Sequence, residues 1–217
     1  MRKERVMDHG SWVVGLVFLL ITPVYAEDLD SILSNVQKTY ENISDMKASF
    51  VQETTSATFK DTQKSEGIVY FKKPGMMRWE YSNPNKDVIV NNGETIWVYQ
   101  PDLGQVMVSK FDKESSPLSK HFLSGMGNVK NDFDVKLGEE TPFSYTLILV
   151  PKTQQPNIRK IHLTIDKKTF MMNKTASFDP FGNIASVRFI DVKTNTNLQK
   201  SIFNFEIPKG VKVVTPQ

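Results

Sequence analysis

Apolar and polar residues alternate along most of the chain after residue 47, in short runs rich in β-branched and aromatic side chains. Asn, Pro, Gly and Asp separate these runs at intervals of roughly ten residues. Because side chains point alternately to the two faces of a strand, the pattern predicts an antiparallel meander of about ten or eleven strands. Asn91-Asn92-Gly93 predicts a tight hairpin, since these residues tolerate a positive φ. The runs lie in residues 48–59, 67–74, 75–84, 87–101, 105–111, 133–139, 143–152, 159–166, 170–179, 184–192 and 201–208.

The apolar residues before these runs have a different spacing. Between residues 29 and 43 the apolar residues recur at every third or fourth position, which predicts an amphipathic helix. Asp28 or Asp30 can cap this helix. Most helices of this kind cover a core, and we expect the same here.

A second, shorter helix is predicted where the strand pattern is interrupted. Ser115 or Ser116 can act as its N-cap, and Pro117 suits its first turn. Its apolar positions are Leu118, Phe122, Leu123 and, near the end, Met126. The expected fold is therefore mainly β: one strongly curled or barrel-like sheet with helices on one side.

The first 26 residues have the composition of a secretory signal. Arg2, Lys3 and Arg5 precede an apolar run at 11–21, which is too short to cross a bilayer. Small residues precede the expected cleavage after Ala26. An uncleaved anchor helix is the alternative. We expect a single mature domain over 27–217, and residue 27 is Glu rather than the Cys of a lipoprotein cleavage site.

Composition narrows the function classes. The region 27–217 holds 24 basic and 22 acidic residues, too even a balance to indicate nucleic-acid binding. There is no cysteine, so an exported form must rely on its core. The isolated His121 and His162 do not form a metal-site pattern, and no nucleophile motif or phosphate-binding glycine loop occurs. Acidic pairs such as Glu139-Glu140 fit solvated turns, so nothing indicates an enzyme or a cofactor.

The strand after Gly75 concentrates large apolar side chains on one face. Alternation places Met77, Trp79 and Tyr81 together, opposite Arg78 and Glu80. Such a face either packs a core or lines a cavity for an apolar ligand, and composition alone favours the core.

The strand predicted after Gly93 also has an apolar face that could pack a core or line a cavity. Trp97 and Tyr99 share one face, whereas Ile96 and Val98 share the other, so only one of these sets can line the same cavity.

Two stretches resemble a known family. FKKPGMMRWEYSNPNKDVIVNNGETIWVYQPDLGQV, residues 71–106, resembles the signature region of the periplasmic outer-membrane lipoprotein carrier family, LolA. FNFEIPKGVKVV, residues 203–214, is similar to the closing motif of that family. The resemblance extends over nearly all of the chain after the signal.

The resemblance implies an unclosed antiparallel half-barrel whose concave apolar face is covered by an α-helical lid. Its cavity would take the acyl chains of lipoproteins released by an inner-membrane ABC transporter, and an outer-membrane acceptor would receive the cargo. We expect a periplasmic monomer without a cofactor.

Candidate residues follow by position. Lys73 stands where the family commonly has an Arg that closes the lid by hydrogen bonds, and Lys lacks the planar donor fork of Arg. Met77 lies near a family position that is often aromatic. The candidate lid residues are Leu118, Phe122, Leu123 and Met126, and the candidate cavity residues are Met77, Trp79, Tyr81, Trp97 and Tyr99.

Other functions remain open at this stage. The same fold could carry a glycolipid or another lipid, or act as a non-transporting module that senses envelope stress. Extraction of bound lipid and the filling of the cavity by the protein's own side chains distinguish these alternatives. A hydrolase lacks a nucleophile and base at usable spacing.

Overall fold

The computed structural model describes residues 28–111 and 129–215. Its helices are α1 (Leu29–Glu41) and α3 (Val129–Asp132), with 3₁₀ turns η1 (Pro101–Leu103) and η2 (Lys200–Phe203). The strands are β1 (Asp45–Thr55), β2 (Thr62–Lys72), β3 (Met76–Asn83), β4 (Val88–Asn91), β5 (Thr95–Gln100), β6 (Gln105–Lys110), β7 (Phe133–Glu140), β8 (Ser144–Pro151), β9 (Lys160–Asp166), β10 (Met172–Phe178), β11 (Ile184–Thr194) and β12 (Lys212–Val214).

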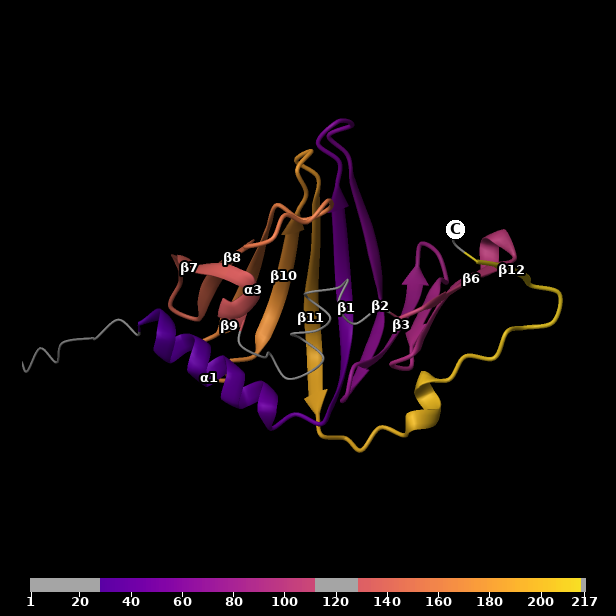
Figure 1. The fold of residues 1–217 in the computed structure, drawn as a ribbon, viewed down its shortest axis with the longest axis horizontal. Coiled ribbons are helices and arrows are strands. Elements are labelled where there is room, and N and C mark those ends of the chain that lie inside the picture. The colour runs from indigo at the N-terminus through magenta and orange to yellow at the C-terminus, as the bar shows by residue number, and fades with distance from the viewer. Residues whose placement is uncertain (1–27, 112–128, 216–217) are drawn as a thin grey trace, which may run out of the picture.

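These strands form one open sheet (Figure 1). Twelve strands follow one another in the order β12-β6-β5-β4-β3-β2-β1-β11-β10-β9-β8-β7, and the two ends do not pair. Every neighbouring pair is antiparallel except β12 and β6, which run parallel. The predicted fold class, a mainly β protein with an unclosed sheet, is confirmed.

The prediction of a last strand at 201–208 is wrong. This segment starts with η2 and continues as extended chain, and pairing resumes only at Lys212. Phe203 is fully buried, and the ring of Phe205 lies 5.5 Å from that of Tyr99 on β5. An extended segment lying across a sheet face alternates its side chains as a strand does, so the period alone did not reveal the missing ladder.

The predicted hairpin at Asn91–Gly93 is confirmed. The side-chain oxygen of Asn92 accepts hydrogen bonds from the backbone N–H groups of Glu94 and Thr95, and Gly93 has a φ of +96°. β4 and β5 therefore pair in a fixed register, with Val90 opposite Trp97.

The inner face of the sheet is the face that carries Phe50, Val69 and Trp79, and the outer face is the other one. α1 covers part of the inner face, and Asp28 caps this helix by accepting from the N–H groups of Asp30 and Ser31. The main core lies between them, and its fully buried members include Ile32, Val36, Phe50, Val69, Phe133, Leu147, Leu149, Ile161, Leu163 and Ile165.

A second, smaller core lies on the outer face of β3 to β6. Val90, Val106 and Phe203 are each 0% exposed, yet they do not belong to the main core. The C-terminal segment supplies Phe203, and the guanidinium of Arg78 donates to the carbonyl of Ile202 at 3.2 Å. β3 to β6 are therefore packed from the side opposite to α1.

Gly67 lies where β2, β3 and the main core meet. A Cβ on Gly67 would stand 2.0 Å from the carbonyl oxygen of Glu80 and 2.9 Å from the ring of Phe50. Only glycine allows the two strands and this ring to approach so closely. Within the described residues, no helix is long and apolar enough to cross a membrane.

Candidate functional site

The structure brings Met77, Trp79 and Tyr81 together on the inner face. The rings of Trp79 and Tyr81 meet that of Phe50 edge to face, with centroids 4.8 Å and 5.1 Å away. The hydroxyl of Tyr81 donates to Gln52 at 2.9 Å. All three predicted residues are only half-buried, and Trp79 and Tyr81 pack against the margin of the main core.

Trp97 and Tyr99 lie on the outer face, apart from the other three. Trp97 pairs with Val90, and Val90 pairs with Arg78, which points away from Trp79. The ring of Phe205 covers them, at centroid distances of 6.5 Å from Trp97 and 5.5 Å from Tyr99. The five aromatic and Met candidates therefore divide between two faces.

The inner face of β4 to β6 is lined by residues that the sequence reasoning did not select. Ile89 pairs with both Trp79 and Val98, and Val98 pairs with Met107, so these side chains form a row across the sheet. Ile96 lies on the same face. Each of them is half-buried. Alternation along β5 separates Ile96 and Val98 from Trp97 and Tyr99. Only the strand register shows that Ile96 and Val98 lie on the same face as Trp79.

The candidate lid residues Leu118, Phe122, Leu123 and Met126 lie outside the described residues.

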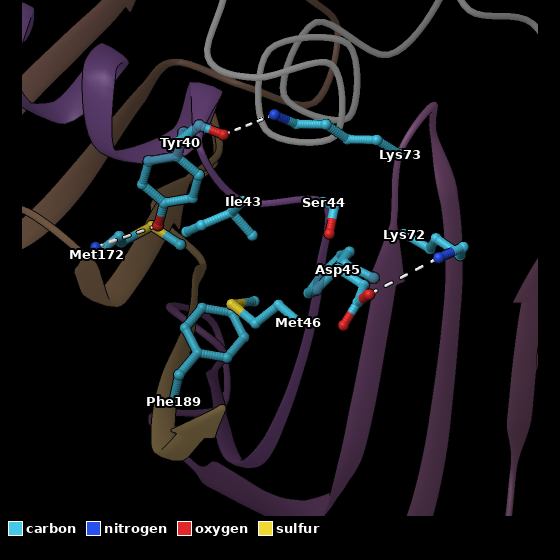
Figure 2. A pocket seen from close by; sticks show the side chains of 10 residues that line it. Tyr40, Ile43, Ser44, Asp45, Met46, Lys72, Lys73, Met172 and Phe189 are labelled. Atoms are coloured by element: carbon cyan, nitrogen blue, oxygen red, sulfur yellow. Dashed lines mark hydrogen bonds and ion pairs between the residues drawn. The ribbon is translucent and has the colours of Figure 1, made fainter. Parts of the chain in front are cut away.

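Lys73 reaches the C-terminal end of α1 (Figure 2). Its ammonium donates to the carbonyl of Tyr40 at 2.6 Å and to that of Glu41 at 3.2 Å. The backbone N–H of Lys73 also donates to the carbonyl of Ser44. A cation at this position complements the negative end of the helix dipole. The pKa of Lys73 lies below its usual value, because burial lowers it more than the charge of Glu41 raises it.

A small apolar cavity lies beneath the contact between Lys73 and α1 (Figure 2). Its volume is about 40 Å³, room for only a few water molecules. Its walls come from α1, the loop after this helix, β1, the end of β2, β10 and β11. The lining residues are Tyr40, Ile43, Ser44, Asp45, Met46, Phe71, Lys72, Lys73, Met172 and Phe189.

Tyr40 fixes the helix to the sheet on the inner side of this cavity. Its ring is 5% exposed, and its hydroxyl accepts a hydrogen bond from the backbone N–H of Met172 at 3.2 Å. Burial raises the pKa of the phenol to about 12, although this hydrogen bond acts in the opposite direction. The hydroxyl therefore stays protonated at neutral pH.

Asp45 connects the start of β1 to the chain after β11. Its carboxylate, which is almost fully buried, accepts from the N–H and hydroxyl groups of Thr196 and from the N–H of Leu198. Burial raises the pKa of Asp45, but these hydrogen bonds and Lys72, 3.7 Å away, outweigh it and hold the pKa below its usual value.

Asn195 adds to this connection. Its side-chain oxygen accepts from the N–H and hydroxyl groups of Ser44, and its amide donates to the carbonyl of Asn42. The loop after α1 and the start of the C-terminal segment are thus held to each other next to the cavity.

The acidic and histidine side chains of the described region do not form a metal cluster. No group of three His, Cys, Asp or Glu side chains in residues 28–111 and 129–215 could hold a metal ion. The buried Nε2 of His162 has no hydrogen-bond partner, and burial, helped by Lys160, lowers the pKa of this imidazole. What the site offers is a broad apolar surface with a cation at its rim, which suits an apolar ligand.

Comparison with known proteins agrees with this arrangement. The model of the family described as outer membrane lipoprotein carrier protein LolA matches residues 41–206. The outer-membrane lipoprotein carrier protein of Legionella pneumophila strain Corby is 30% identical over 204 residues, which cover 91% of this chain and 98% of that protein. The protein of the same name from Nitrosomonas europaea is 28% identical over 198 residues, with 91% and 94% covered.

One solved structure supports the fold. A crystal structure of an uncharacterized conserved protein from Thermus thermophilus superposes with a TM-score of 0.56. The superposition covers 86% of this chain and 98% of that one, at 17% sequence identity. At this identity the similarity concerns the fold alone.

Proposed function

Since this chain belongs to the family of outer membrane lipoprotein carrier proteins, we propose that it carries lipoproteins with their acyl chains held on the inner face of its sheet. The observation that supports this most strongly is the row of half-buried apolar side chains Trp79, Ile89, Val98 and Met107. This row continues the main core beyond α1. A monomeric protein rarely leaves so broad an apolar surface without a ligand.

The energetics of acyl chains require such a surface. Each methylene group removed from water contributes about 0.8 kcal/mol, so a lipoprotein cannot cross an aqueous compartment with its chains exposed. Binding must also be reversible, because a carrier has to release its cargo. A cover that exchanges its own apolar contacts for those of the cargo lowers the net affinity and allows release.

We propose that α1 belongs to this cover and that Lys73 holds it closed. The cavity of about 40 Å³ is far too small for an acyl chain, so α1 has to move before a chain can extend from the inner face of β3 to β6 into the region beneath this helix. Movement of its C-terminal end breaks the two hydrogen bonds from Lys73. In this proposal Leu118, Phe122, Leu123 and Met126 contribute the remainder of the cover, and Met77, Trp79 and Tyr81 line the cargo site.

The remaining parts of the proposal concern partners and location. Residues 1–26 act as an export signal, and the protein works as a monomer in the periplasm. An inner-membrane ABC transporter supplies the acylated lipoproteins, and an outer-membrane acceptor receives them. The protein performs no catalysis, since binding and release are all that the transfer requires.

Native mass spectrometry tests the cargo. The protein is expressed in a Gram-negative periplasm and purified without detergent. A bound mass that resolves into a triacylated polypeptide is the expected result. A bound lipid without polypeptide would contradict the proposal, and so would an empty protein that stays empty after acylated peptide is added.

A further inference from the structure

Two hairpin turns carry the most exposed large apolar side chains of the described residues. Phe59, in the turn between β1 and β2, is 82% exposed, and Phe181, in the turn between β10 and β11, is 80% exposed. Both turns lie at the same end of the sheet, opposite the end near which α1 finishes (Figure 1). Exposing two phenylalanine rings to water costs free energy, and neither ring packs in a core.

The two turns are in contact. The N–H of Ala57 donates to the side-chain oxygen of Asn183 at 3.0 Å, and Thr55 pairs with Ile184 at the end of the β1–β11 ladder. Figure 1 shows both turns extending past the neighbouring strands. The two rings are thus presented by one protruding unit, which we call the twin tip (residues 55–62 and 178–184).

Hydrogen bonds make each turn rigid. In the first, Ser56 accepts from Phe59 through its hydroxyl and from Lys60 through its carbonyl, at 3.3 Å and 2.9 Å. In the second, the carboxylate of Asp179 accepts from the N–H groups of Phe181 and Asn183, both at 2.8 Å. Rigid turns lose little conformational entropy on binding, so the rings are preorganised for contact with a partner.

We propose that the twin tip is a membrane-contact site that inserts Phe59 and Phe181 into the interfacial region of a lipid bilayer. The tip is convex and its rings are not set in a groove. A bilayer interface adapts to such a shape, whereas a protein partner would need a pocket for each ring. Small and mostly hydroxyl-bearing residues precede Phe59, since residues 54–58 are Thr, Thr, Ser, Ala and Thr, and Asp179 and Asn183 flank Phe181; such side chains suit the hydrated headgroup layer.

The charges around the twin tip also fit a bilayer. The twin tip carries Lys60, Asp61 and Asp179, and below it Lys64 lies opposite Glu53, so the net charge is only −1 and the tip approaches a membrane without a large electrostatic barrier. Attachment then depends on apolar insertion and little on salt. This inference does not depend on what the inner face binds.

Vesicle binding tests the inference. Residues 27–217, which contain the whole described fold, are sedimented with vesicles of phosphatidylethanolamine and phosphatidylglycerol, and separately with phosphatidylcholine vesicles. The wild type should bind both, and the double variant Phe59→Ser/Phe181→Ser should lose roughly tenfold or more in partition coefficient. Each single variant should show part of this loss.

Phe143 provides a matched control. It is 76% exposed in the turn between β7 and β8, at the other end of the sheet, where Lys167 donates to its carbonyl. Phe143→Ser should bind vesicles as the wild type does. A direct reading comes from Phe59→Trp in a background in which Trp79 and Trp97 are replaced by Phe, and its emission should be quenched by lipids brominated on their acyl chains.

The outcomes that overturn the inference are specific. They are absence of wild-type binding to either vesicle, an equal loss with Phe143→Ser, and binding that requires phosphatidylglycerol and disappears in high salt. Capture of an acylated peptide in solution is measured in parallel and should be unchanged in the double variant, so a failure of the cargo proposal is recognised separately.

Discussion

The two halves of the sheet solve the same packing problem in opposite ways. Strands β7 to β11 bury their inner face beneath α1, in a core that includes Leu147, Leu163 and Ile165. Strands β3 to β6 are instead packed on their outer face, where the C-terminal segment inserts Phe203. Their inner face, with Val98 and Met107, stays half-buried. We call β7 to β11 with α1 the closed half, and β3 to β6 the open half.

This difference separates stability from ligand binding. A sheet needs one well-packed face, and β3 to β6 obtain it from the outside. Apart from Trp79 and Tyr81 on β3, which contact the ring of Phe50, their inner face is left half-buried and is available for an apolar ligand. Trp79, at one end of the row on β3 to β6, packs against the main core, so the apolar surface of the open half adjoins the core of the closed half.

The largest expected effect concerns the joint between the two halves. Gly67→Ala should cost about 4 kcal/mol or prevent folding, because the added Cβ meets the backbone oxygen of Glu80 at 2.0 Å. Urea unfolding measures this loss. Gly138→Ala is the control: its Cβ meets mainly the flexible side chain of Ile148, at 2.9 Å, and should cost about 1 kcal/mol. Equal losses would show that the joint is not special.

Asp45 ties the start of β1 to the chain after β11, which leads into the C-terminal segment packed on the open half. Asp45→Ala should lower the free energy of unfolding by about 3 kcal/mol, because three donors lose a charged acceptor. Asp45→Asn keeps one acceptor oxygen and should lose less.

The pH dependence of Asp45 has a defined sign. Because its folded pKa lies below the ordinary value of 3.8, its stabilisation is present above that pH and is lost as the pH falls further. Acid unfolding of the wild type should therefore include a component that is missing in Asp45→Asn. Identical acid profiles would contradict the assigned role.

Tyr40 probes the closed half alone. Its pKa rises from 10.0 to about 12 on folding, so its protonated form stabilises the fold below pH 10, and this contribution is lost as the pH rises towards 12. Relative to Tyr40→Phe, the wild type should lose roughly 2 to 3 kcal/mol across that interval. Thermal unfolding at stepped pH measures it. Parallel curves for the two proteins would mean that the phenol is not buried.

Lys73 has the smallest expected effect on stability and the most direct effect on opening. Lys73→Met removes both donors to α1 and should cost about 1 kcal/mol, while uptake of a fluorescent acylated peptide becomes several-fold faster. Lys73→Arg should restore slow uptake.

The neighbouring lysine provides the control for Lys73. Lys72 pairs with Asp45 and does not hold α1, so Lys72→Met should leave the uptake rate unchanged. Faster uptake in both variants would indicate a general loosening instead of a specific contact.

Much of the fold could be predicted from local patterns, because α1 and most strands are set by the spacing of apolar residues. The faces of β5 could not be assigned in this way. Alternation separates Trp97 from Val98, but which of the two joins Trp79 depends on pairing through β4. The larger aromatic side chains suggested the wrong choice for an inner row, since Phe205 covers them on the outer face.

Other parts depend on contacts between residues distant in sequence. The hydrogen bonds of Asp45 link it to residues more than 150 positions away, and no local pattern reports them. The position of Lys73 was suggested by family resemblance, and its contact with the carbonyls of Tyr40 and Glu41 became visible only when α1 was placed on the sheet.

Site-specific photo-crosslinking tests the central claim, that cargo lies on the inner face, most directly. A benzophenone amino acid replaces Val98 or Met107 on the inner face, or Trp97 or Val108 on the outer face of the same strands. The proteins are loaded with a lipoprotein that carries radiolabelled acyl chains. We predict labelled adducts from the two inner positions and none from the two outer ones. Adducts from the outer positions, or a loaded protein without adducts at Val98 and Met107, would contradict this account.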